Sequence, residues 1–213
     1  MQLPATTKEH RLALYASTIA FQWIASGIIL WRTLVHNIRP GQLGLDISRP
    51  LLTLLVTIGI TALILLNQIV GLRRLATQPA ASQGMVSQLA MKLFPQDDVE
   101  RLAFFALVAT VAVCEEFIYR GFVQRVFQTL AGGSISFAVV GSAAFFALAH
   151  LYQGRRGLIS TFIIGIFFSM TTAMTLSLVP SIAAHFVADL TAGLLAPKYL
   201  TARTGAAPEP ALP

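Results

Sequence analysis

Long runs of apolar residues, separated by short polar segments, dominate the chain. The apolar runs cover residues 12–34, 51–72, 98–120, 135–152, 157–179 and 180–196. A helix needs about 20 apolar residues to cross the hydrocarbon core of a bilayer. The pattern therefore predicts an all-α protein, a polytopic membrane helix bundle with about six transmembrane helices.

Residues near the ends of these runs predict where the helices begin and end. Asp97 is placed to cap the third helix, with Glu100 completing a capping box three residues later. Gly121 is expected to bend or end this helix, and residues 122–130 would continue as a second piece. Ser134 is a predicted N-cap, and Pro180 suits the first turn of the last helix.

Two segments do not fit the spanning pattern. Between the second and third runs, apolar residues recur at helical spacing: Met85, Val86, Leu89, Ala90, Leu93 and Phe94. They predict a short interfacial helix, or a helix packed on the bundle. Residues 197–213 are expected to be a disordered tail. Three parts follow: an N-terminal two-helix segment with an amphipathic linker (1–97), a catalytic helix bundle (98–196) and the tail.

Composition and charge support a membrane location. Only 11% of the 213 residues are charged and the mean hydropathy is +0.72, too apolar for a soluble domain of this length. The positive residues flank the apolar runs, which is typical of topology signals and does not favour a nucleic-acid partner. With the N-terminus inside, ten of the 15 Lys and Arg residues lie in inner segments. We expect an integral protein of the bacterial inner (plasma) membrane with both termini in the cytoplasm.

Five ionisable residues interrupt otherwise apolar helices: Glu115, Glu116, His150, His185 and Asp189. Each costs roughly 2.5–3.5 kcal/mol at the centre of a spanning helix on insertion scales. Five such residues on three helices predict a shared polar centre.

Spacing along the helices separates the roles of these residues. Glu116 and Arg120 are four residues apart and in the favourable order for an ion pair, so they are predicted to support the structure. Glu115 lies about 100° further round the helix and remains available. His185 and Asp189 share one helix face.

Carboxylates and imidazoles brought together in this way support two kinds of chemistry. A carboxylate and a histidine can activate a water molecule as a general base without any cofactor. Glu115, His150, His185 and Asp189 could instead bind zinc, although the HExxH arrangement of soluble zinc proteases is absent. The residues alone leave the cofactor open between none and zinc.

Three motifs resemble a known family. "EEFIYRG" (115–121) fits Glu-Glu-x-x-x-Arg, "FALAH" (146–150) fits Phe-x-x-x-His, and "HFVAD" (185–189) fits His-x-x-x-Asn/Asp. Their order and separation resemble the CPBP family of intramembrane proteases. This family includes the type II CAAX prenyl endopeptidases and the bacterial Abi-type bacteriocin-processing and immunity proteins.

The resemblance implies hydrolysis of a peptide bond inside the membrane, in a peptide or membrane-protein substrate. It implies that Glu115 is the base, that His150 orients the water, and that His185 and Asp189 lie at the oxyanion or a metal. Many members have asparagine where this chain has Asp189. An ionised aspartate cannot donate to an oxyanion, so Asp189 is expected to hold His185 or a metal, unless it is protonated.

One geometric problem accompanies this prediction. His150 lies near the end of the fourth span and His185 near the start of the sixth, so a simple up-and-down bundle would separate them. The helices must tilt, break or end within the membrane around a water-filled cavity. A non-catalytic immunity or scaffold protein of the same fold and a proton-coupled transporter are the alternative functions.

Overall fold

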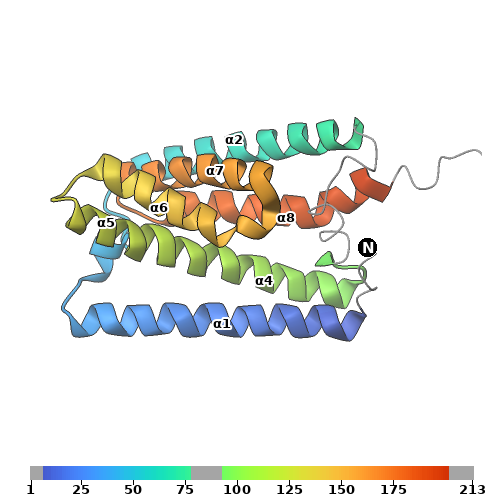
Figure 1. The fold of residues 1–213 in the computed structure, drawn as a ribbon, viewed down its shortest axis with the longest axis horizontal. Coiled ribbons are helices and arrows are strands. Elements are labelled where there is room, and N and C mark those ends of the chain that lie inside the picture. Colours follow the sequence, from blue (N-terminus) through green and yellow to red (C-terminus); the bar gives the residue numbers. More distant parts are fainter. Residues whose placement is uncertain (1–6, 78–92, 202–213) are drawn as a thin grey trace, which may run out of the picture.

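The computed structural model describes residues 7–77 and 93–201, and its regular structure is entirely helical over these residues (Figure 1). The elements are α1 (Lys8–Val35), η1 (Pro40–Leu43), α2 (Pro50–Thr77), α4 (Asp98–Glu116), η3 (Phe117–Val123), α5 (Gln124–Leu130), α6 (Ile135–Ala149), η4 (Leu151–Gln153), α7 (Gly154–Thr175) and α8 (Val179–Thr201). Five helices are long and apolar enough to cross a membrane, and α6 is a shorter apolar helix. The predicted helical membrane bundle is confirmed.

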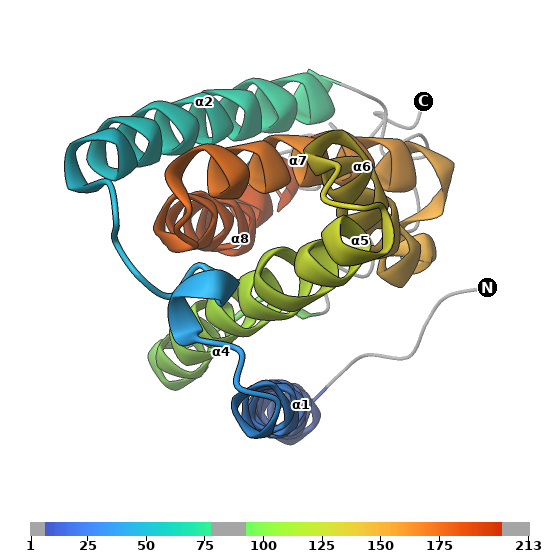
Figure 2. The ribbon, with the colours of Figure 1, turned by 90° about the vertical axis from the view of Figure 1, so that its left-hand side faces the viewer.

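The long helices lie roughly side by side, with α1 along one edge and α2 along the other (Figure 1). The main packing pairs are α2 with α8, α6 with α7, and α1 with α4. Viewed from the end, α8 lies between α2 and α4 (Figure 2). The two helices that carry most of the candidate site, α4 and α8, are therefore neighbours in the middle of the bundle.

The third span is one continuous helix, so, of the bend or end predicted at Gly121, the end is wrong. Residues Phe117–Val123 form a π-helical segment between α4 and α5, and the whole stretch Asp98–Leu130 remains helical. A Cβ atom on Gly121 would lie 2.9 Å from the carbonyl oxygen of Leu43. The glycine therefore allows η1 to approach closely, and it does not break the helix.

The α6 helix ends earlier than predicted. It stops at Ala149 and not at residue 152, which makes it about 22 Å long and shorter than the bilayer core. Ser134 caps it as predicted, because its Oγ accepts from the backbone N–H of Phe137 at 3.4 Å. Pro180 lies in the first turn of α8, also as predicted.

Two further predictions concern segments at the limits of the described chain. Most of the predicted interfacial helix, residues 85–92, lies outside the described residues, as does the tail after residue 201. The helical backbone of α8 continues to Thr201. The predicted boundary at Ala196 is thus too early, and residues 197–201 are helical and not a disordered tail.

The start of α4 is tied to α1 by a buried ion pair. Asp97 caps α4 as predicted, accepting from the backbone N–H of Glu100 at 2.9 Å. The Glu100 carboxylate does not complete the expected capping box. It contacts Arg11 Nη2 at 2.7 Å and accepts from the backbone N–H of Gln96 at 2.6 Å. The sequence placed Arg11 among the topology charges, but a buried carboxylate on the neighbouring helix is its partner.

A second, exposed pair lies beside the buried one. Lys8 Nζ is 2.6 Å from Asp97 Oδ2, and both side chains remain substantially exposed. The Lys8 ammonium group holds the pKa of the Asp97 carboxyl below its usual value. Exposed pairs of this kind contribute little to stability, so the Arg11–Glu100 pair is the stronger link between α1 and α4.

The buried pair leads to a stability prediction. The Glu100→Gln variant should lose about 3 kcal/mol of unfolding free energy, because the Arg11 charge stays buried without its carboxylate partner. Thermal unfolding of the purified chain in detergent micelles, followed by circular dichroism, measures this loss. The matched control is Asp98→Asn, which removes an acidic residue from the same helical turn but only an exposed pair with Arg101. The control should lose less than about 1 kcal/mol; equal losses would contradict the prediction.

Candidate active site

The four predicted catalytic residues line a single cavity of about 450 Å³ between α1, α4, α8 and the connection from α6 to α7. Glu115 comes from α4, His150 from the end of α6, and His185 and Asp189 from α8. Much of the remaining wall is apolar and includes Leu14, Phe104, Leu107, Val108, Val111 and Ala192. The structure thus combines a polar cluster with an apolar space inside a bundle of membrane-spanning helices.

The early end of α6 explains how two distant histidines meet. His150 is the residue that follows α6, and its Nδ1 lies 2.8 Å from the carbonyl oxygen of Phe146. His185 lies less than two turns into α8. Both imidazole rings pack on Phe146, with centroid distances of 4.6 Å for His150 and 6.0 Å for His185. The helix that ends early, as the geometry of the site required, is therefore α6.

The predicted Glu116–Arg120 ion pair is present and fully buried. Arg120 Nη1 donates to Glu116 Oε1 at 2.9 Å, and neither side chain is exposed. The guanidinium carbon also lies 4.2 Å from the ring centroid of Phe146 and 5.3 Å from that of Phe168. Cation–π contacts of this kind stabilise a desolvated guanidinium group.

Glu116 has a second partner that the sequence did not reveal. The same oxygen, Oε1, lies 2.8 Å from His185 Nδ1. On the other side of the ring, His185 Nε2 lies 3.5 Å from Asp189 Oδ2. His185 is therefore held between two carboxylates, and donation to both requires a proton on each ring nitrogen. Glu116 supports a site residue directly in addition to pairing with Arg120.

Glu115 has a different environment from that of Glu116. Its Oε1 accepts a hydrogen bond from Gln22 Nε2 of α1 at 3.0 Å. Its Oε2 is buried and has no hydrogen-bond partner among the described residues. Sequence reasoning missed Gln22, although it is the one amide side chain in the apolar run 12–34. One carboxylate oxygen is held in place, and the other needs a partner from outside the described part of the chain.

Zinc binding would depend on which donors of the cluster are available. Among the residues that the structure describes, no three His, Cys, Asp or Glu side chains are grouped in a way that could hold a metal ion as they stand. Both nitrogens of His185 face carboxylates, so His185 would have to exchange one of these contacts for a metal bond. His150 directs Nδ1 to a backbone carbonyl, which is the usual arrangement of a metal-binding histidine and leaves Nε2 as its possible ligand atom.

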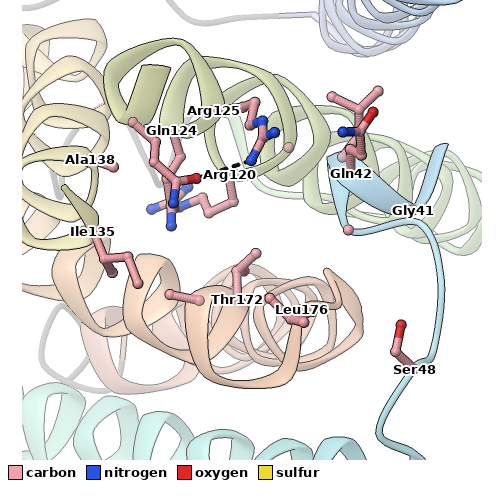
Figure 3. Close-up of a pocket in the computed structure, with 15 residues that line it drawn as sticks. Gly41, Gln42, Ser48, Arg120, Gln124, Arg125, Ile135, Ala138, Thr172 and Leu176 are labelled. Atoms are coloured by element: carbon pink, nitrogen blue, oxygen red, sulfur yellow. Dashed lines mark hydrogen bonds between the residues drawn. The ribbon is translucent and has the colours of Figure 1, made fainter. Parts of the chain in front are cut away.

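A second cavity of about 270 Å³ lies at the end of the bundle where η1, α5, α6 and α7 meet (Figure 3). Its lining includes Arg120, Gln124 and Arg125, together with Thr172 and Leu176 from the end of α7 (Figure 3). None of the four predicted catalytic residues lines it. The titratable cluster therefore assigns the candidate active site to the first cavity.

Comparison with known protein families gave a match over part of the chain. Residues 98–191 match the family described as type II CAAX prenyl endopeptidase Rce1-like. Neither the curated proteins nor the solved structures gave a significant match. The matched segment runs from the start of α4 into α8 and includes Glu115, Glu116, His150, His185 and Asp189. The segment 98–191, which provides most of the candidate site, is therefore similar to the Rce1-like family of type II CAAX prenyl endopeptidases.

Proposed function

We propose that this chain is an intramembrane endopeptidase of the CAAX-protease kind, which hydrolyses a peptide bond with water activated by Glu115. The observation that carries the proposal is the shared cavity. Two histidines, an aspartate and a carboxylate line it within a bundle of membrane-spanning helices, and one oxygen of that carboxylate has no hydrogen-bond partner among the described residues. The family match to a protease family points to the same reaction.

In the proposed mechanism, Glu115 Oε2 is the general base. His150 Nδ1 donates to the Phe146 carbonyl, so Nε2 of the neutral ring accepts a hydrogen bond and orients the water. Glu115 takes a proton as the water oxygen bonds to the substrate carbonyl carbon. The same carboxyl then gives this proton to the leaving amine as the C–N bond breaks.

His185 is proposed to stabilise the oxyanion that forms in this reaction. Its contact with Glu116 is short and buried, whereas Asp189 is 3.5 Å away and its side chain is 40% exposed. The Nε2–H group makes only a long contact with Asp189, so it can donate a hydrogen bond to a negative charge that develops nearby. In this role Asp189 positions His185, which agrees with the inability of an ionised aspartate to donate.

The substrate is proposed to be a peptide or a segment of a membrane protein, because the cavity has an apolar wall next to its polar cluster. The bacterial inner membrane and the cytoplasmic position of both termini remain predictions from the sequence.

Substitutions of the two adjacent glutamates should separate catalysis from support. Glu115→Gln should reduce cleavage at least 100-fold with little change in the unfolding midpoint, because it removes the base. Glu116→Gln should lower stability by about 3 kcal/mol, because Arg120 stays buried without its counter-charge. Cleavage of a peptide library by the chain in liposomes, read by mass spectrometry, tests activity, and farnesylated and unmodified CAAX peptides test for prenyl dependence.

The assignment of Glu115 as the base and Glu116 as its support would be contradicted if Glu115→Gln were active while Glu116→Gln were stable but inactive. If the folded wild-type chain cleaves neither the library peptides nor the CAAX peptides, the non-catalytic alternative is favoured.

Substitution of Asp189 tests its positioning role. Asp189→Asn should retain cleavage within about tenfold, because the amide oxygen still accepts from His185 Nε2. Asp189→Leu should lose about 10- to 100-fold, by analogy with residues that orient metal-bound histidines. If kcat is the same for both variants, Asp189 does not position His185.

The absence of a metal requirement is also testable. The proposed reaction needs no metal, so activity should persist after treatment with a strong chelator and dialysis into metal-free buffer. Elemental analysis of the purified chain accompanies the assay. Stoichiometric zinc whose removal ends activity and whose return restores it would show that the site is a metal centre.

A further inference from the structure

The first helix contributes a wall to the candidate active site. Leu14, Thr18 and Gln22 are spaced four residues apart and therefore lie on one face of α1. Leu14 and Thr18 line the 450 Å³ cavity, and Gln22 bonds to Glu115. All three residues lie outside the segment 98–191 that matches the protease family.

The contact between Gln22 and Glu115 supplies a constraint that α4 does not provide. The terminal torsion of a glutamate side chain has a broad energy profile, so burial of the chain does not by itself fix the orientation of the carboxylate. The amide of Gln22 donates to Oε1 at 3.0 Å, which leaves Oε2 as the oxygen without a partner among the described residues. The donor thus determines which oxygen is available to a water molecule.

The position of Gln22 is itself well defined, because α1 is attached to α4 on both sides of it. The next residue, Trp23, donates from Nε1 to Thr110 Oγ1 at 3.2 Å. Towards the N-terminus, the buried Arg11–Glu100 pair joins the same two helices. A donor held in this way loses little further conformational freedom when it binds the carboxylate.

We propose that Gln22 is a positioning residue that orients the Glu115 carboxylate for catalysis, so that the active site extends beyond the family segment to α1. The catalytic part of this inference depends on the proposed function. The hydrogen bond between Gln22 and Glu115, and its effect on the protonation of Glu115, do not depend on the proposed function. Both can be measured without any substrate.

Protonation of Glu115 depends on every charged or titratable group that faces it. These groups are Cys114, Glu116, Tyr119 and Arg120 on the same span, His185 and Asp189 on α8, and His150 after α6. From α1, Gln22 contributes an uncharged donor to the carboxylate. A variant at position 22 therefore changes one hydrogen bond and leaves these groups in place.

The test is labelling of Glu115 by dicyclohexylcarbodiimide, an apolar reagent that reacts with protonated carboxyl groups. The full chain in phosphatidylcholine liposomes is labelled across a range of pH and the modified peptide is quantified by mass spectrometry, with Glu115→Gln identifying its signal. Gln22→Met keeps the length of the side chain and removes the donor. Its labelling curve should move to higher pH by about one unit, because the ionised carboxylate loses a hydrogen bond.

Two further variants complete the series. Gln22→Glu replaces the donor with a carboxyl group of the same size and should move the curve further in the same direction. Trp23→Phe is the matched control, because it removes the neighbouring hydrogen bond between α1 and α4 and leaves Gln22 intact. Its labelling curve should move by less than that of Gln22→Met, because the Gln22 donor remains and the buried Arg11–Glu100 pair still joins α1 to α4.

The same variants give a catalytic readout. For a peptide cleaved by the wild type, Gln22→Met should lower kcat about tenfold at pH 7 with KM within about twofold, and it should move the acid limb of the rate profile upwards. A labelling curve for Gln22→Met that coincides with the wild type would overturn the inference, even if the chain is a protease. If the labelling curve of Gln22→Met is shifted but the wild-type chain cleaves no peptide, the contact between Gln22 and Glu115 is confirmed and its catalytic role is rejected.

Discussion

A single carboxylate oxygen, Oε1 of Glu116, connects the parts of the bundle that form the site. It accepts from Arg120 one turn further along the same span and lies 2.8 Å from His185 on α8. A charge buried without partners would be prohibitively costly, so both partners must remain in place while the bundle is folded. This requirement fixes the relative position of the third span and α8, and with it the distance between the two sides of the cavity.

Phe146 extends the same constraint to α6. Its ring packs on the Arg120 guanidinium group and on the imidazoles of both His150 and His185. The length of α6 matters for this arrangement, because a helix continuing to residue 152 would place His150 within a regular turn and not at the point where the chain reverses. A short helix, an aromatic ring and a buried ion pair together bring residues from three elements to one cavity.

The sequence predicted several of the features that depend on local interactions. The caps at Asp97 and Ser134 and the pairing of Glu116 with Arg120 each involve residues at most four positions apart, and local helix geometry determines them. The gathering of buried charges was also predictable, because isolated burial of five ionisable residues is too costly.

The contacts that sequence reasoning missed join residues far apart in the chain. Glu116 and His185 are 69 positions apart, Arg11 and Glu100 are 89 apart, and Gln22 and Glu115 are 93 apart. Such pairs depend on which helices are neighbours and how each is rotated about its axis. These properties arise from the packing of all side chains and have no signal within a single apolar run.

The buried ion pair connects the linings of the two cavities. The cavities share no lining residue among those described; Arg120 borders one, while its partner Glu116 contacts His185 of the other. A change in the position of Arg120 at one cavity would therefore be passed through Glu116 to the imidazole at the other. A molecule that displaced the guanidinium group from its place in one cavity would thus disturb the geometry of the other without entering it.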